Sequence, residues 1–168
     1  CISSAASDVY KRQVQSSVDS LASQAREAGV VVEVGALPPA ALLGDGVQLE
    51  IVLRNLLANA IQALAGMPEG AERRVAVDAG QDGGQDGGTV WIRIADNGPG
   101  IPASIRPRLF EPFVSLKSSG LGLGLAISRA IVEAHGGTLS AEAGRHAVLK
   151  IVLPASTPEG EKEDTDES

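Results

Sequence analysis

The sequence predicts an α+β fold in two layers, in which helices cover one face of a single β-sheet. Two observations support this class. Segments with helical spacing of apolar residues alternate with short runs rich in Val and Ile. In addition, 43% of the 168 residues are hydrophobic, enough for one core, yet only 2% are aromatic. We therefore expect one compact domain whose core consists of Leu, Val, Ile and Ala.

The elements of the first half follow from periodicity and capping residues. Apolar residues at helical spacing predict a helix over residues 14–28, and the run "VVVEV" predicts a strand over 30–34. Asp45, with Gln48 three residues later, forms a capping-box pattern and is expected to begin a helix that ends near residue 64.

The second half completes the sheet. We expect strands over 74–79 and 90–96, joined by the glycine-rich segment 80–88 as a flexible hairpin tip. An irregular, lid-like segment from about 98 to 121 leads into a helix over 123–135. Two strands, over 138–143 and 147–153, follow it. The domain is expected to span 14–154, preceded by a non-domain lead over 1–13 and followed by a disordered acidic tail over 155–168.

Charge and cysteine content restrict the partners and the environment. The formal net charge of −7, with no cluster of Lys and Arg, argues against nucleic acid or an anionic membrane surface as the main partner. The single cysteine, Cys1, excludes an internal disulfide and fits a reducing compartment. No apolar run approaches the length of a membrane span, and no signal peptide is visible. The irregular start at Cys1 leads us to expect a segment of a longer protein.

The predicted helix over 45–64 contains two asparagines. Asn55 and Asn59 are four residues apart, so both amides project from the same side, with Gln62 close by. Asparagine is a poor helix former because its side chain competes for backbone hydrogen bonds. Alone, the pair fits either a solvated helix face or a site where an amide oxygen ligates Mg²⁺ beside phosphates.

The stretch "IADNGPGIP" ends the strand over 90–96. Asp96 is expected at the strand end, where its carboxylate can accept a hydrogen bond from an exocyclic amine. Gly98 and Gly100 would let a flat ring approach the backbone. Because Asn-Gly and Gly-Pro form turns unaided, a simple turn is the favoured explanation of this stretch taken alone.

The segment "RLFEPFVSLK" holds both phenylalanines of the chain, Phe110 and Phe113, within an irregular region. Loops seldom concentrate apolar residues without something to cover. The segment therefore either fills a gap in the core or covers a ligand as a lid. Lys117 is either a cation directed at that ligand or a solvated side chain.

The run "SGLGLGLAIS" places Gly120, Gly122 and Gly124 before a predicted helix. A glycine-rich turn that leads into a helix exposes N–H groups at the positive end of the helix dipole, which favours phosphate binding. The spacing matches neither the lysine-bearing phosphate loop nor the dinucleotide fingerprint, so these two classes are excluded. A merely flexible loop remains the alternative.

Taken in order, "NLLANA", "DNGPG", "FEPF" and "GLGLGLAIS" resemble the N, G1, F and G2 boxes of the catalytic ATP-binding domain of sensor histidine kinases. This Bergerat fold, a mixed sheet with helices on one face, is shared with gyrase and Hsp90 ATPases. The resemblance covers about residues 14–154. The continuation into the last helix looks most like kinases of the nitrogen-regulation and oxygen-sensing type.

The resemblance implies roles for individual residues. Asn59 matches the magnesium ligand, Asp96 the partner of the adenine amino group, and Asn55 and Lys117 the catalytic positions. The remaining nucleotide-binding positions that it implies are Gln62, Gly98, Gly100, Ile101, Phe110, Gly120, Leu121, Gly122, Leu123, Gly124 and Leu125. ATP and Mg²⁺ are thus the implied cofactors. Where the family often has a Gly-Thr pair near the adenine, this chain has His146 and Ala147, which puts that contact in doubt.

The same resemblance implies transfer of the γ-phosphoryl group to a histidine rather than hydrolysis, because the amide of Asn55 replaces the glutamate that activates water in the ATPase relatives. The acceptor is expected on a dimerisation domain outside this chain, since His135 and His146 fit structural positions better. A response regulator would then receive the phosphoryl group. The expected location is cytoplasmic, within a protein that is free or anchored to the membrane. The alternatives are a non-catalytic nucleotide-binding module and a serine-kinase anti-sigma factor of the same fold.

Overall fold

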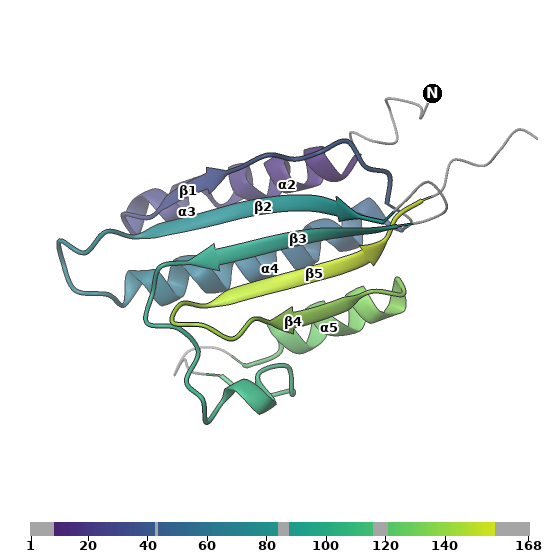
Figure 1. Ribbon diagram of the computed structural model, residues 1–168. Coiled ribbons are helices and arrows are strands. Elements are labelled where there is room, and N and C mark those ends of the chain that lie inside the picture. Colours follow the sequence, from purple (N-terminus) through teal and green to yellow (C-terminus); the bar gives the residue numbers. More distant parts are fainter. Residues whose placement is uncertain (1–8, 43, 84–87, 116–120, 157–168) are drawn as a thin grey trace, which may run out of the picture.

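The computed structural model describes residues 9–42, 44–83, 88–115 and 121–156. They form one five-stranded sheet with strand order β1-β2-β3-β5-β4, and the helices lie on one of its faces (Figure 1). The strands are β1 (Val31–Val34), β2 (Arg74–Asp82), β3 (Thr89–Asp96), β4 (Thr138–Ala141) and β5 (Val148–Pro154). Among these described strands only β1 pairs in parallel, with β2, so the sheet is mixed. The predicted two-layer α+β class is confirmed.

Three long helices form the second layer. In Figure 1, α4 (Gly46–Ala65) lies behind the centre of the sheet, between α2 (Val9–Ser20) and α5 (Gly124–Ala134). The short helix α3 (Ala22–Glu27) follows α2, and one 3₁₀ turn, η1 (Arg106–Arg108), precedes α5. Within the described ranges, no helix is long and apolar enough to cross a membrane.

The core lies between α4 and the inner face of the sheet. Its helix side is largely leucine, with Leu53, Leu56 and Leu64 at most 1% exposed. The central strands alternate buried and half-buried residues, as expected for a sheet with one covered face. The core is aliphatic as predicted, apart from Tyr10, which is 1% exposed and donates its hydroxyl hydrogen to the carbonyl oxygen of Pro38. Burial raises the pKa of Tyr10 to about 12.

Several predicted boundaries were wrong, including that of the strand predicted over 138–143, which ends at Ala141. The first helix begins at Val9, not residue 14, and a turn at Leu21 separates it from α3. The strands β2 and β3 extend to Asp82 and from Thr89, so their pairing continues into the segment predicted as a flexible tip. Residues 84–87 of that segment and 157–168 of the predicted tail lie outside the described residues, and the division of the chain at 14 and 154 stays a prediction.

The start of α4 is tied to the end of α5. Asp45 caps α4 as predicted, because its side chain accepts a hydrogen bond from the N–H of Val47 at 2.8 Å. The capping box with Gln48 was wrong, since the N–H of Asp45 donates to Nε2 of His135 at 3.2 Å. The other ring nitrogen of His135, Nδ1, donates to the carbonyl oxygen of Ile131 at 2.7 Å. His135 therefore holds two helix ends together, which is a structural role.

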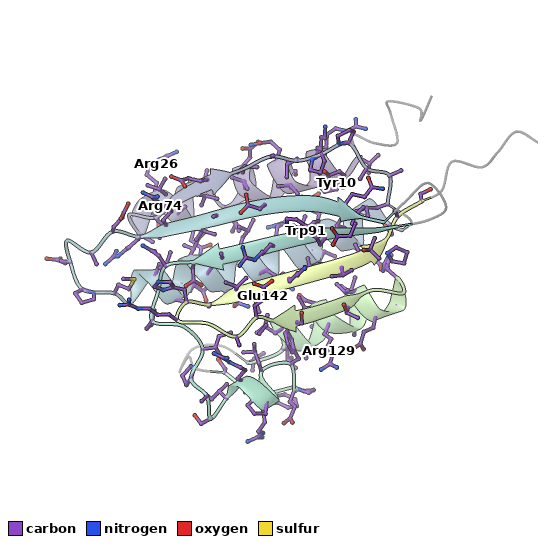
Figure 2. The ribbon with its side chains drawn as sticks, viewed as in Figure 1. Tyr10, Arg26, Arg74, Trp91, Arg129 and Glu142 are labelled. Atoms are coloured by element: carbon purple, nitrogen blue, oxygen red, sulfur yellow. The ribbon has the colours of Figure 1, made fainter. Side chains whose placement is uncertain are left out.

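The opposite face of the sheet is open and mostly polar. Figure 2 shows Trp91 on this face at the centre of the sheet. A Cβ atom at Gly80, on the neighbouring strand, would lie 2.2 Å from the indole ring, so the ring covers bare backbone. The ammonium group of Lys150 lies 5.5 Å from the ring centroid, and Arg93 pairs with Glu142 at 2.8 Å.

Candidate functional site

The candidate site lies where β3 ends, beside the C-terminal half of α4 and above the segment that leads to α5 (Figure 1). Asp96 is the last residue of β3, as predicted, and is only 8% exposed. Its Oδ1 accepts a hydrogen bond from the N–H of Gly98 at 2.9 Å. Burial raises the pKa of Asp96, while the bond to Gly98 and the nearby His146 partly oppose this increase. The strand thus presents one buried carboxylate at its end.

The turn after Asp96 is held rigidly. The Asn97 side chain accepts from the N–H of Arg74 at 2.8 Å and donates to the carbonyl oxygen of Glu72 at 3.0 Å. Gly100 has φ of 83°, and a Cβ atom there would lie 2.4 Å from the carbonyl oxygen of Arg145. Packing against the β4–β5 connection therefore explains this glycine without any ligand. Ile101 packs against the core just beyond it.

A cavity of about 530 Å³ opens beside this turn. Its wall combines apolar groups from the end of α4 with polar groups from the turn and the β4–β5 connection. The lining residues are Ala63, Gly66, Met67, Pro68, Asn97, Gly98, Pro99, Arg145 and His146. A concave, mixed surface of this size suits a small organic ligand such as a purine base. Of the predicted site residues that the structure describes, only Gly98 lines this cavity.

The two asparagines of α4 are in different surroundings. Asn55 donates from Nδ2 to Oγ of Ser128 at 3.3 Å and to the carbonyl oxygen of Gly124 at 3.5 Å, so its amide joins α4 to the first turns of α5. Asn59 is half-buried one turn further along, and Gln62 is exposed. The structure thus brings Asn55 to the glycine-rich start of α5.

Gly122 and Gly124, at the start of α5, differ in the space around their Cα atoms. Gly122 has φ of 69°, and a Cβ atom there would lie 2.8 Å from the backbone of Phe113 and Val114. In contrast, among the described residues a Cβ atom at Gly124 would meet nothing nearer than Cγ of Asn55 at 4.0 Å. The space in front of Gly124 is therefore open, and the first turn of α5 offers the unpaired N–H groups of a helix N-terminus.

The lid segment is closed at its base. The N–H of Phe113 donates to the carbonyl oxygen of Gly122 at 3.1 Å, which joins the two ends of the loop between them. The Phe110 ring lies 5.6 Å from the guanidinium of Arg129 on α5, which favours a cation–π contact. Phe113 itself is 76% exposed. Lys117 and Gly120, both predicted site residues, lie outside the described residues.

The leucines around α5 differ in exposure. Leu121 is 76% exposed, Leu123 is half-buried and Leu125 packs against the core. Sequence reasoning gave no role to Ser128, which is fully buried in α5 and accepts the Asn55 hydrogen bond. Its signal was a lone hydroxyl among apolar residues, "GLAISRAIV". The contact between Phe110 and Arg129 carried no sequence signal, because it depends on how the lid folds back.

Residues 44–157 match the model of the family described as histidine kinase-, DNA gyrase B- and HSP90-like ATPase, and the chain belongs to this family. Its fold and family are those of the ATP-binding catalytic domain of sensor histidine kinases. Among solved structures, the mycobacterial sensor histidine kinase MprB superposes with a TM-score of 0.72 at 30% identity, over 88% of this chain and 95% of that chain.

Two curated relatives are named as sensor proteins. The chain is 46% identical over 110 residues to the C4-dicarboxylate transport sensor protein DctB of Rhizobium meliloti, which covers 64% of this chain and 17% of that protein. It is 35% identical over 162 residues to the sensor protein FixL of Bradyrhizobium diazoefficiens, over 88% of this chain and 31% of that protein. The chain therefore spans less than a third of the length of these two relatives.

Proposed function

We propose that this chain holds ATP between Asp96 and the start of α5 and supplies its γ-phosphoryl group to a histidine on a dimerisation domain outside the chain. The observation that carries this proposal is the buried carboxylate of Asp96 at the end of β3, beside the cavity of about 530 Å³. A buried carboxylate with one oxygen committed to Gly98 keeps acceptor capacity for the amino group of adenine.

The phosphates would lie toward the first turn of α5. The open space in front of Gly124, next to Asn55, leaves room for phosphate oxygens to approach the N–H groups of the helix. Lys117, in the predicted lid, is the cation proposed to approach the γ-phosphate. Positioning and charge neutralisation are the main contributions that a protein makes to phosphoryl transfer.

The side chains fit a magnesium ion only together with the nucleotide. Among the described residues, no group of three or more His, Cys, Asp and Glu is gathered to hold a metal ion. Amide oxygens are hard ligands, so Asn59, with phosphate oxygens and water, would hold Mg²⁺. The bound ion would neutralise charge on the phosphates.

Transfer is favoured over hydrolysis by the chemistry of Asn55. Its amide cannot take a proton from water, and its Nδ2 already donates to Ser128. In the proposed reaction, the bond between the γ-phosphorus and the bridging oxygen breaks, ADP leaves, and a P–N bond forms with the acceptor imidazole, which loses its N–H proton. An aspartate on a response regulator would then accept the phosphoryl group.

Among the described residues, three exposed apolar side chains near the lid offer a surface to the acceptor domain. Phe113 and Leu121 are each 76% exposed, and Ile127 on α5 is 47% exposed. Exposed apolar residues next to a reactive site favour protein contact. We propose that the dimerisation domain covers them during transfer.

Transfer between separate proteins tests this function. The 168-residue chain, incubated with radioactive ATP and Mg²⁺, should carry no label itself but should label a separately supplied dimerisation domain that contains its acceptor histidine. The rate should be low, because no tether raises the local acceptor concentration. Label on this chain that His135→Ala or His146→Ala abolishes would contradict the proposal. Confirmed ATP binding with no transfer to any acceptor domain would favour the non-catalytic module.

A further inference from the structure

His146 lies on the wall of the cavity beside Asp96, in the connection between β4 and β5. Its Nδ1 is 2.8 Å from the carbonyl oxygen of Gly98. A carbonyl oxygen only accepts, so Nδ1 carries the hydrogen and donates it. The ring orientation is therefore determined by this bond, which is made to the turn after β3.

Gly98 is held from two sides. Its N–H donates to Oδ1 of Asp96 at 2.9 Å, and its carbonyl oxygen accepts from His146. The three residues form one chain of hydrogen bonds, from the carboxylate through the glycine backbone to the imidazole. Because Gly98 is buried, a loss of the imidazole donor would leave its carbonyl oxygen without this partner.

His146 contacts the turn that follows β3 from the side of the β4–β5 connection. Gly100 contacts the backbone of Arg145 so closely that a Cβ atom would lie 2.4 Å from its carbonyl oxygen. The β4–β5 connection thus meets the turn at two neighbouring points, once through backbone at Gly100 and once through the His146 side chain. Only the second contact is a hydrogen bond made by a side chain.

We propose that His146 is a positioning residue for the nucleotide base, which fixes Gly98 and thereby the carboxylate of Asp96 in the geometry that accepts the adenine amino group. This inference rests on the proposed role of Asp96. His146 acts through Gly98 and is not assigned a step in phosphoryl transfer.

The charge of His146 gives a second, separable effect. The protonated ring also donates from Nδ1, so a change in its charge does not break the bond to Gly98. The positive ring lies near Asp96 and lowers the pKa of that carboxyl group, against the increase caused by burial. Among the described residues that line the cavity, Arg145 carries the one other charge, and the end of α4 contributes uncharged groups.

Two variants separate the donor from the charge. Asparagine places an N–H group close to the position of Nδ1 but has no positive form, whereas alanine removes both. At pH 7.5 the affinity for ADP with Mg²⁺ should fall about 10-fold in His146→Ala, the effect of about 1.4 kcal/mol. His146→Asn should restore it to within about 3-fold of wild type, since one neutral hydrogen bond replaces another.

The pH profile completes the test. As the pH is lowered, the affinity for ADP should fall when Asp96 is protonated, and in both variants this loss should begin at higher pH than in wild type. A His146→Asn variant as weak as His146→Ala at pH 7.5, or an unchanged acid limb in both variants, would overturn the inference.

Asp96→Asn, measured in parallel, separates this inference from the function on which it rests. If wild type fails to bind ADP, or if Asp96→Asn binds it as wild type does, the proposed function fails. If wild type binds ADP, Asp96→Asn does not, and the His146 variants behave as wild type, only the positioning role of His146 fails. Calorimetric titration gives each affinity.

Discussion

Asp96 combines a function with a cost in stability. A carboxylate that is 8% exposed has lost most of its hydration, and the N–H of Gly98 replaces only part of it. The pKa of Asp96 is therefore raised by burial. Because the pKa of Asp96 is higher in the folded than in the unfolded state, the contribution of this group to stability is fully present below its unfolded pKa. It is lost as the pH rises through its folded pKa. The ionised group therefore opposes folding.

Asp96→Asn should therefore have opposite effects on binding and on folding. The amide oxygen still accepts from the N–H of Gly98, but the amide nitrogen presents a donor toward the adenine amino group. We expect the affinity for ATP to fall at least about 10-fold, while the nucleotide-free protein at pH 7 is as stable as wild type or more stable. Calorimetric titration and urea unfolding measure the two quantities.

The exposed Asp82→Asn serves as the matched control for loss of one carboxylate, with both quantities expected to stay unchanged. Equal nucleotide affinities of wild type and Asp96→Asn would remove the base-binding assignment. A clear loss of stability in Asp96→Asn would contradict the burial argument.

Asn59 is the residue through which the metal proposal can be tested. We expect Asn59→Ala to bind ATP with a smaller gain from added Mg²⁺ than wild type, because an amide ligand is removed while the nucleotide contacts of Asp96 remain. Titration of ATP at increasing Mg²⁺ measures the gain. Gln48→Ala, on an exposed position of the same helix, should keep the wild-type response. A folded Asn59→Ala with a wild-type magnesium titration contradicts the ligand role.

Among the elements, α4 and α5 are joined by side-chain hydrogen bonds at two points. The side chain of Asp45 caps the first turn of α4, and the backbone N–H of Asp45 donates to His135 at the end of α5. Asn55 reaches the start of α5. Both ends of α5 are thus joined to α4 by side-chain hydrogen bonds. Since Gly124 and Asn55 belong to the proposed phosphate region, the alignment of these two helices determines the shape of that region.

The capping bond at Asp45 should stabilise the fold measurably. Asp45→Ala leaves the N–H of Val47 without its side-chain partner and is expected to lower the free energy of unfolding by about 1 kcal/mol. Asp45→Asn, which keeps a capping oxygen, should stay within a few tenths of a kcal/mol of wild type. Urea unfolding midpoints measure both. Equal losses in the two variants would mean that the carboxylate charge, not the cap, provides the stability.

Periodicity predicted the elements well but their ends less well. The strands and α4 have strong apolar patterns, and Asp45 is a clear capping residue, so their positions followed from local rules. The break at Leu21 and the burial of Tyr10 were missed because both depend on where α2 packs against the rest of the molecule. The extension of β2 to Asp82 was missed because glycines in the segment argued for a turn, whereas pairing with β3 overrides local preference.

At the scale of the whole molecule, the site is an assembly of distant segments. The order of four motifs along the chain is sufficient to predict that Asp96, Asn55 and the glycine run belong to one site. The contacts that join them could not be predicted in the same way. The bonds from Asn55 to Ser128 and from His146 to Gly98 connect residues 73 and 48 positions apart, and no local pattern indicates such pairings.

The proposed role of Phe113 concerns the whole molecule, because its proposed partner is another domain. It has φ of 65° and an exposed ring, so asparagine, which tolerates this conformation, is a suitable replacement. We expect Phe113→Asn to slow phosphoryl transfer to a supplied acceptor domain at least about 5-fold, the effect of roughly 1 kcal/mol, with unchanged affinity for ATP. Labelling rates at saturating ATP measure this.

Val47→Asn removes another exposed apolar side chain, 68% exposed at the start of α4, and should transfer at the wild-type rate. Equal slowing in both variants would indicate a general effect of lost apolar surface and would contradict a specific lid contact. Unchanged transfer in Phe113→Asn would exclude this ring from the docking surface.

Trp91, the single tryptophan of the chain, lies on the open face of the sheet against Gly80 and Lys150, on the side away from the helices. Its fluorescence therefore reports the integrity of the central strands and not the occupancy of the proposed nucleotide site. A mutational series at Asp96, Asn59 or His146 can be followed optically during unfolding without interference from bound nucleotide. Conversely, a change in emission on addition of ATP would mean that binding is transmitted through β3 to the opposite surface of the sheet.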